Sequence, residues 1–228
     1  MAMIADNIEA VRARIARACA AAARPVESVT LLAVSKRFAP QSVREAVAAG
    51  LHRFGENHVQ EGVEKITALG DLRTRLEWHL IGPLQSNKTR VVAECFDWVH
   101  SVDRLKIAER LSEQRPADLP PLQVCLQVNI SAEASKSGVA PAEVEALAFG
   151  VAALPRLTLR GLMSIPVPIE DVAAQRTPHR ALRALFDALR GRGLAIDTLS
   201  IGMSADLEAA IAEGATIVRI GSAIFGSR

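Results

Sequence analysis

Residues 29–36, VTLLAVSK, decide how the fold of this chain is interpreted. The run from Val29 to Val34 is short and apolar, has no polar alternation and is bounded by Ser28 and Ser35. These features are typical of a strand buried on both faces of a parallel sheet. A lysine, Lys36, follows the run almost directly.

The same pattern of a short apolar run and a helical segment repeats on both sides of this stretch. Before it, apolar residues recur at helical spacing from Ile4 to Ile15, and this amphipathic helix ends before Pro25. Seven further strands are predicted at His52–Gly55, Leu76–Ile81, Trp98–Ser101, Leu122–Asn129, Leu157–Leu162, Thr198–Ile201 and Thr216–Ile220. Further helices are predicted at Gln41–Ala49, Asn57–Leu69, Asp103–Glu113, Pro141–Ala153, Val172–Arg190 and Ala205–Glu213.

Eight strands alternating with helices predict a single (β/α)8 TIM-type barrel domain over residues 1–228, with an extra N-terminal helix. A doubly wound open sheet is the competing topology. That fold normally has a glycine-rich turn after an early strand, and residues 34–38, VSKRF, contain no glycine. The barrel is therefore the favoured fold.

Composition limits the function classes. The 27 basic and 25 acidic side chains are interspersed, which leaves no basic stripe for nucleic acid. Cys19, Cys95 and Cys125 are widely spaced, so we expect reduced thiols and no metal site. Charges within residues 1–23 argue against a signal peptide or a membrane span, so a cytoplasmic protein is expected.

Lys36 is the first candidate functional residue, because the carboxyl ends of barrel strands form the functional end of this fold. The chain has five lysines against 22 arginines, and Lys36 alone follows a buried strand. Partial desolvation favours the neutral, nucleophilic amine, which forms an imine with an aldehyde. The ordinary alternative is a lysine that keeps its charge in water at the strand end.

The last two strands predict a phosphate site. Residues 200–204, SIGMS, close the seventh strand, and residues 219–226, RIGSAIFG, close the eighth. Each supplies a glycine, a hydroxyl and backbone N–H groups at a turn, which suit a phosphate monoester. The alternative is that Ser204 only caps the following helix and that Gly221 only turns the chain.

Three polar residues near these strand ends need separate interpretation. Arg219 interrupts an apolar strand and must find a partner in the barrel, which is ordinarily a carboxylate. Asn57 suits hydrogen bonding to a ligand's ring hydroxyl or imine, or capping of the next helix. His79 lies within its strand and is interpreted as a hydrogen-bonded core histidine rather than a catalytic one.

Six segments together resemble the pyridoxal phosphate homeostasis protein family, also called the YggS or PROSC family. They are LLAVSKRF, FGENHVQEGVEK, EWHLIGPLQSNKTR, VNISAEASKSG, GLMSIP and LSIGMSADLEAAIAEGATIVRIGSAIFG. The resemblance runs from the first helix to Gly226. It implies the barrel of the alanine racemase N-terminal domain without that enzyme's second domain.

The resemblance also implies the ligand, pyridoxal 5'-phosphate, and its contacts. Lys36 would be the Schiff-base lysine, and Arg219 would lie at the pyridine nitrogen. The residues implied around the phosphate are Met203, Ser204, Gly221 and Ser222. Two departures from the family are His58, where a tyrosine is usual, and the end of the sequence at Arg228 without the usual charged tail, which puts tail-mediated regulation in doubt.

Three functions follow from these features. The first is a reversible carrier in pyridoxal phosphate homeostasis, monomeric and without catalytic residues, which could deliver the cofactor to apoenzymes. The second is an amino-acid racemase or related enzyme, but the chain contains no tyrosine, and the cysteines do not follow strand ends. The third is a phosphate-ligand barrel enzyme that uses Lys36 as a base or as a Schiff base with a sugar phosphate.

Overall fold

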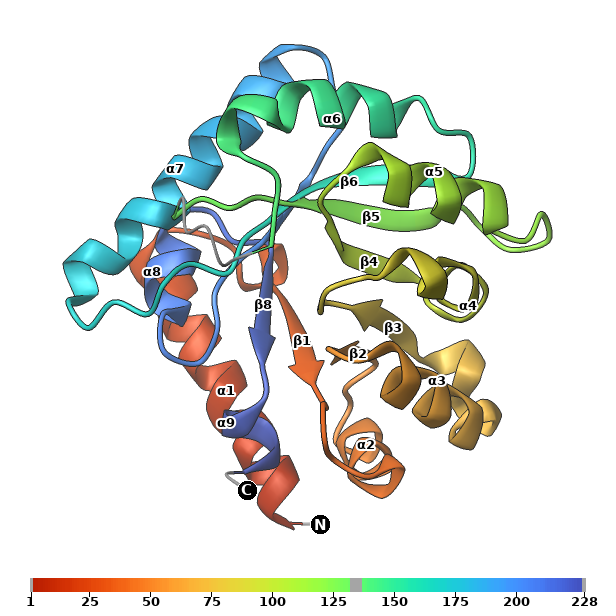
Figure 1. Ribbon diagram of the computed structural model, residues 1–228. Helices are drawn as coiled ribbons and strands as arrows, with labels where there is room; N and C mark the ends of the chain where they lie inside the picture. Colours follow the sequence, from red (N-terminus) through yellow and green to blue (C-terminus); the bar gives the residue numbers. More distant parts are fainter. Residues whose placement is uncertain (1, 132–136, 227–228) are drawn as a thin grey trace.

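Eight parallel strands form a closed barrel in chain order, with the last strand paired to the first (Figure 1). The computed structural model describes residues 2–131 and 137–226. The strands are β1 (Thr30–Val34), β2 (Arg53–Glu56), β3 (Glu77–Leu80), β4 (Trp98–Val102), β5 (Leu122–Gln127), β6 (Leu157–Met163), β7 (Thr198–Ser200) and β8 (Ile217–Ile220). The closed barrel confirms the predicted fold class, and each of the eight predicted strands overlaps an observed one.

Helices pack around the outside of the barrel (Figure 1). The helices are α1 (Ala2–Ala21), α2 (Pro40–Ala48), α3 (Val59–Ala68), α4 (Thr89–Cys95), α5 (Leu105–Gln114), α6 (Val144–Ala152), α7 (Val172–Gly191), α8 (Leu207–Ala212) and α9 (Ser222–Phe225). Short 3-10 helices lie at η1 (Val26–Ser28), η2 (Gly70–Arg75), η3 (Ser86–Lys88) and η4 (Pro141–Glu143). The extra N-terminal helix expected from the sequence is α1.

The structure adds two helices to the predicted elements and shortens one predicted strand. Helices α4 and α9 were not predicted, because segments of seven and four residues are too short to show a helical period. The strand predicted over Leu122–Asn129 ends at Gln127. Beyond it the Asn129 N–H donates to the Val139 carbonyl at 3.0 Å, so the chain pairs locally instead of extending the barrel.

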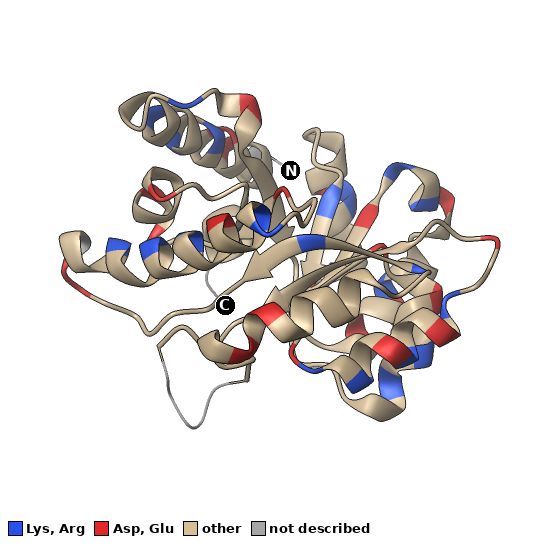
Figure 2. Cartoon of the chain, turned by 90° about the horizontal axis from the view of Figure 1, so that it is seen from above, with Lys and Arg blue, Asp and Glu red and all other residues tan. Residues whose placement is uncertain are grey.

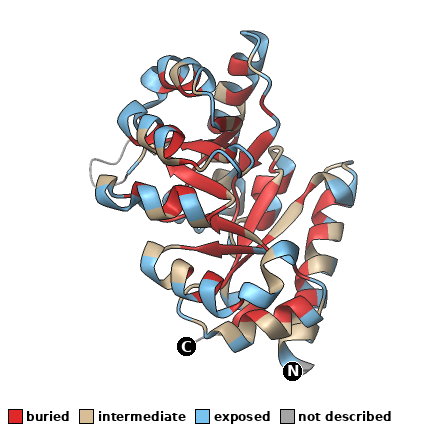
Figure 3. Ribbon diagram, turned by 90° about the vertical axis from the view of Figure 1, so that its right-hand side faces the viewer, coloured by how far each residue is buried: buried red, intermediate tan, exposed pale blue. Residues whose placement is uncertain are grey.

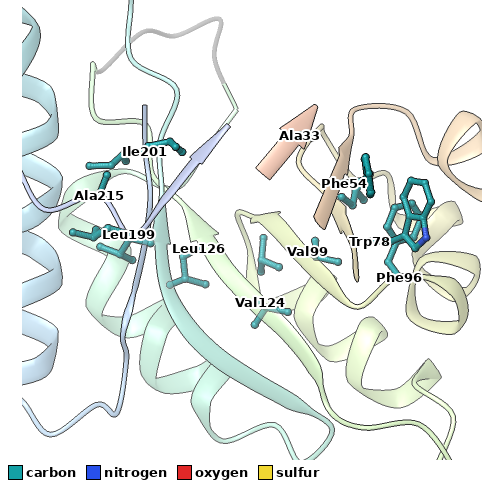
Figure 4. Packing of buried hydrophobic residues seen from close by; sticks show 14 of the residues in the cluster. Ala33, Phe54, Trp78, Phe96, Val99, Val124, Leu126, Leu199, Ile201 and Ala215 are labelled. Atoms are coloured by element: carbon teal, nitrogen blue, oxygen red, sulfur yellow. The ribbon is translucent and has the colours of Figure 1, made fainter. Parts of the chain in front are cut away.

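The strands separate two apolar regions, because side chains alternate between the two faces of a strand. On β1, Leu32 and Val34 belong to a cluster inside the barrel, whereas Ala33 belongs to the larger cluster between strands and helices. Figure 4 shows part of the larger cluster, in which the rings of Phe54 and Trp78 lie 5.7 Å apart. Figure 3 shows the buried strands enclosed by helices with exposed outer faces.

The surface charges of both signs are mixed over the helices (Figure 2). No helix among the described residues has the length and apolar character needed to cross a membrane. In the same part of the chain, no group of three or more His, Cys, Asp or Glu side chains has an arrangement that could hold a metal ion.

Candidate functional site

The candidate residues lie at the end of the barrel where the parallel strands finish, which we call the mouth. In the register of β1 and β2, Val34 pairs with Gly55, and the Ser35 N–H donates to the Gly55 carbonyl at 3.1 Å. Lys36 and Asn57 are each two residues beyond this pair. They therefore leave the barrel side by side, and both are partly buried.

The ends of β7 and β8 continue the same rim on the other side of β1. Ala33 of β1 pairs with Ile220 of β8, and a Cβ atom at Gly221 would lie 3.1 Å from the Val34 carbonyl oxygen. The Arg219 N–H donates to the Gly202 carbonyl at 2.9 Å. The strand order β7, β8, β1, β2 thus brings all seven predicted site residues to one arc of the mouth.

The segment after β8 presents backbone donors at the rim. Ser222 begins α9 and is exposed, and the Ile224 and Phe225 N–H groups both bond to the Gly221 carbonyl. The first N–H groups of a helix have no partner inside it. Within the part of the chain that the structure describes, no acceptor bonds to the N–H groups of Ser222 and Ala223, so these donors suit an acceptor at the mouth.

In the segment after β7, Ser204 is not the helix N-cap, so the alternative role considered for it from the sequence does not hold. Helix α8 begins at Leu207 with Asp206 at the N-cap position. The Asp206 carboxylate instead accepts from the Met203 N–H at 2.7 Å, so residues 203–206 form a turn before the helix. Gly202 lets the chain enter this turn, since its φ of +93° is a left-handed conformation and a Cβ there would lie 2.6 Å from that of Ala210.

Helix α1 fixes both rim segments, a role that helical periodicity could not reveal. It packs against α8 and α9 (Figure 1). Arg14 donates to the Ser204 carbonyl at 2.7 Å and forms two bonds to the Glu208 carboxylate at 2.5 and 2.6 Å. Asn7 donates to the Ile224 carbonyl at 2.9 Å. The N-terminal helix therefore holds the segments after β7 and β8 in place.

A buried ion pair fixes the residue before Lys36. The Lys65 ammonium donates to the Ser35 carbonyl at 2.6 Å and to Glu56 at 2.8 Å, and the Ser35 hydroxyl donates to the same carboxylate oxygen at 2.6 Å. Burial raises the pKa of Glu56, and the hydrogen bonds from Lys65 and Ser35 offset part of that effect. Helical spacing alone places Lys65 on a face of the predicted helix Asn57–Leu69 and does not reveal this role.

Glu61 holds the residue after Lys36. Together, Glu56, Glu61 and Lys65 form a group that we call the clamp. The Glu61 carboxylate accepts from Lys65 at 2.8 Å and from the backbone N–H of Arg37. Arg37 has a φ of +64°, a conformation that is uncommon for a non-glycine residue. The backbone on both sides of Lys36 is thus held by one group of side chains from β2 and α3. The four-residue spacing of Glu61 and Lys65 was the one signal available in the sequence.

Arg219 points into the barrel and is fully buried around its guanidinium group. Among the described residues, its hydrogen-bond partners are the Ser200 carbonyl, the Ser200 hydroxyl at 2.9 Å and the Ser164 carbonyl at 2.8 Å. The carboxylate partner considered from the sequence is not found in this part of the chain. Burial lowers the pKa of Arg219 to about 10, which leaves the side chain charged at neutral pH.

Several buried polar atoms near the mouth lack partners within the described residues. They include Asn57 Oδ1, Ser164 Oγ and Glu56 Oε2. The N-cap of α3 is His58, so capping does not explain Asn57. Buried polar atoms are nearly always hydrogen-bonded. The orphan oxygens of Asn57 and Ser164 therefore mark places where a ligand or water would supply the missing bonds.

His79 is a buried, hydrogen-bonded core histidine, as predicted. Its Nε2 lies 2.9 Å from Glu77 and its Nδ1 lies 2.8 Å from His100. The three cysteines are free and lie away from the rim arc. Cys125 is inside the barrel, where burial raises the pKa of its thiol to about 12. The loop residue Lys136, whose contact with a ligand the sequence left open, lies outside the described residues.

Comparison with known proteins agrees with this geometry. Residues 6–228 match the family model described as alanine racemase, N-terminal domain. The chain is 61% identical to the pyridoxal phosphate homeostasis protein of Pseudomonas aeruginosa, over 100% of this chain and 97% of that protein. It is 56% identical to the protein of the same name from Escherichia coli, over 99% and 97% of the two chains.

A solved structure matches equally completely. PipY of Synechococcus elongatus, solved with pyridoxal phosphate bound, is 38% identical and superposes with a TM-score of 0.86, covering 98% of this chain and 100% of that one. The barrel, the order of the rim segments and these full-length matches agree. The chain belongs to the alanine racemase N-terminal domain family and, within it, to the pyridoxal phosphate homeostasis proteins.

Proposed function

We propose that this protein binds pyridoxal 5'-phosphate as a Schiff base on Lys36 and acts as a reversible carrier in intracellular pyridoxal phosphate homeostasis. In this proposal it works as a monomeric single-domain barrel in the cytoplasm and can deliver the cofactor to apoenzymes. The observation that carries the proposal is that Lys36 meets, on one arc of the mouth, buried oxygens and backbone N–H groups that have no partner within the described residues.

Lys36 suits reversible covalent binding of an aldehyde. Addition of its amine to the aldehyde carbon forms a C=N bond, and the aldehyde oxygen leaves as water. Hydrolysis reverses the step and returns the free aldehyde. The clamp formed by Glu56, Glu61 and Lys65 supports this role, because it holds the backbone at residues 35 and 37 while leaving Lys36 itself at the rim.

The other rim residues suit the remaining parts of the cofactor. The N–H groups of Ser222 and Ala223, the hydroxyl groups of Ser204 and Ser222 and the nearby Met203, with glycines at Gly202 and Gly221, would hold the phosphate. The orphan oxygen of Asn57 would accept a hydrogen bond from the ring hydroxyl. Of these groups, the Asn57 oxygen is buried and has no partner within the described residues.

Arg219 favours a carrier over an enzyme. A charged arginine beside the pyridine nitrogen keeps that nitrogen unprotonated and weakens the ring as an electron sink. Racemases of this barrel type also use a second acid or base, commonly tyrosine or cysteine. This chain has no tyrosine, and the buried thiol of Cys125 is not ionised at neutral pH. We therefore propose no catalytic residue.

An absorbance titration with pyridoxal phosphate tests the proposal. The wild-type protein should develop a visible absorbance band that is absent from Lys36→Ala and retained in Lys106→Ala, a control at an exposed lysine of α5. An unchanged band in Lys36→Ala would contradict the Schiff base. Rapid racemisation of any member of a panel of D- and L-amino acids would contradict the carrier role and favour the racemase.

A further inference from the structure

The inside of the barrel holds a continuous line of hydrogen-bonded polar groups that runs from the strand amino ends to Arg219. Glu77 lies 2.9 Å from His79 Nε2, and His79 Nδ1 lies 2.8 Å from His100 Nε2. His100 Nδ1 lies 2.8 Å from Ser200 Oγ, which accepts from Arg219 at 2.9 Å. Because β4 and β7 are not neighbours in the barrel, the bond between His100 and Ser200 crosses its interior.

We propose that Glu77, His79, His100 and Ser200 are positioning residues for Arg219, and that every donor along this polar chain points from Arg219 toward Glu77. In this arrangement the polar chain links the carboxylate of Glu77 to a guanidinium that has no hydrogen-bonded carboxylate partner within the described residues. The part of this inference that concerns the cofactor rests on the proposed function, because Arg219 is there assigned to the pyridine nitrogen.

The Glu77 end fixes the direction of the polar chain, and the Arg219 end is compatible with it. A guanidinium group can only donate, so Ser200 Oγ accepts from Arg219 and keeps its own proton available for His100 Nδ1. An ionised carboxylate can only accept, so Glu77 must receive a proton from His79 Nε2. When both histidines are neutral, only one pattern satisfies the Glu77 end, in which each ring carries its proton on Nε2 and Ser200 donates to His100 Nδ1.

The surroundings support these protonation states. Burial lowers the pKa of His79, and Glu77 offsets only part of this effect. Burial, together with the neighbouring His79 and Arg219, holds the pKa of His100 well below its usual range. Burial opposes the charge of Glu77, but His79 and Arg53, whose Nε is 3.0 Å away, lower the pKa of Glu77 to about 2.

Other charges near the polar chain agree with this pattern. Asp97 faces the His79 end and Asp206 faces the Arg219 end, and both act at a distance rather than through a hydrogen bond to the chain. The Glu77 end is the accessible one, since 38% of its side chain is exposed beside a cavity of about 340 Å³ at the strand amino ends. Solvent therefore reaches the polar chain at the end opposite the mouth.

The polar chain leaves Arg219 defined donors for a ligand. Its Nη1 is used twice by Ser200 and its Nη2 once by the Ser164 carbonyl. Of the five N–H groups of the guanidinium, these bonds occupy three within the described residues. The fixed orientation leaves Nε–H and one Nη2–H for a group at the mouth.

Histidine NMR tests the polar chain without any cofactor. The full chain, labelled with ¹⁵N-histidine, should show His79 and His100 as neutral Nε2–H forms at neutral pH. His79→Gln and His100→Gln would assign the two signals, and the exposed ring of His52 provides the solvent reference. A proton on Nδ1 of either ring, or a charged ring at neutral pH, would overturn the inference. This outcome is independent of whether the protein binds pyridoxal phosphate.

A pair of serine variants tests the link to the cofactor. Ser200→Ala cuts the polar chain beside Arg219, so we expect about tenfold weaker binding of pyridoxal phosphate and a displaced visible band. Ser112→Ala removes a buried hydroxyl from α5 and should change neither. Unchanged binding and spectrum in Ser200→Ala would overturn the positioning role. Failure of the wild type to bind would instead overturn the proposed function.

A charge variant at the far end separates position from electrostatics and does not alter the strand around Ser200. Glu77→Gln keeps a hydrogen-bond acceptor for His79 but removes the charge. The Nε2–H forms should persist while the affinity for pyridoxal phosphate falls by less than in Ser200→Ala. An affinity equal to that of the wild type would exclude a contribution of the Glu77 charge to cofactor binding through the polar chain.

Discussion

Two polar regions of the same barrel are partnered in opposite ways. At the mouth, buried oxygens of Asn57 and Ser164 lack partners within the described residues. Deeper inside, the rings of His79 and His100 are bonded at both nitrogens. An unpaired buried polar group costs stability, so proteins keep it where a ligand supplies the partner. The two histidines inside the barrel thus find their hydrogen-bond partners within the protein, whereas polar groups at the mouth need a bound ligand to supply them.

The largest expected change in stability comes from breaking the clamp that holds the backbone on both sides of Lys36. Lys65→Met leaves Glu56 as a buried charge without its cation, which should lower the free energy of unfolding by about 3–5 kcal/mol. Urea unfolding measures the loss. Lys106→Met, at an exposed lysine of α5, should have little effect. A loss as small as that of the control would show that the buried pair does not support the rim.

A smaller effect should follow from crowding the backbone of Asn57. A Cβ atom at Gly82 would lie 2.0 Å from the Asn57 carbonyl oxygen, so Gly82→Ala must move this part of the rim. We expect a loss of about 1–3 kcal/mol in unfolding free energy and weaker binding of pyridoxal phosphate. Gly70→Ala is the matched control, because no atom lies within 4 Å of its added Cβ. Equal stability of the two variants would refute the close approach.

The buried ring of His100 should make the unfolding free energy depend on pH. Because burial lowers the pKa of His100 from its ordinary 6.5, the unfolded chain takes up a proton below pH 6.5 that the folded chain does not. This group therefore lowers stability as pH falls below 6.5. The difference in unfolding free energy between the wild type and His100→Gln should shrink on acidification. A difference that grows as pH falls would mean that the folded ring is charged.

The smallest effect is expected at the mouth. Ser164→Ala removes a buried hydroxyl that has no partner within the described residues, so the unfolding free energy without cofactor should stay within about 0.5 kcal/mol of the wild type. Binding of pyridoxal phosphate should nevertheless weaken, because the hydroxyl is then unable to contact it. A large loss of stability without cofactor would show that the Ser164 hydroxyl, like the two histidines, finds its partner within the protein.

Sequence patterns predicted the barrel well, because buried parallel strands produce short apolar runs such as Val29–Val34 that stand out between helical periods. They also brought Lys36 and Gly221 to one end of the fold, since parallel strands share a direction. They could not show which side chains meet across the barrel. The bond between His100 and Ser200 joins residues 100 positions apart, and no local pattern encodes it.

The misplaced details have local causes. Ser204 looked like a helix cap because a hydroxyl before a helical period is the usual signal, but the Asp206 carboxylate holds the turn by binding the Met203 N–H. The sequence pattern places Lys65 only on a helical face. Its burial depends on the ion pair with Glu56 of β2, nine residues earlier. The packing of α3 on the barrel brings the two side chains together, and no local sequence pattern predicts it.

Borohydride trapping tests the central claim most directly. The purified protein, incubated with pyridoxal phosphate, would be reduced with borohydride, digested and mapped by mass spectrometry. We expect one modified lysine, Lys36, and no modification of that peptide in Lys36→Ala. Trapping on Lys65, Lys88, Lys106 or Lys136 in place of Lys36 would contradict it.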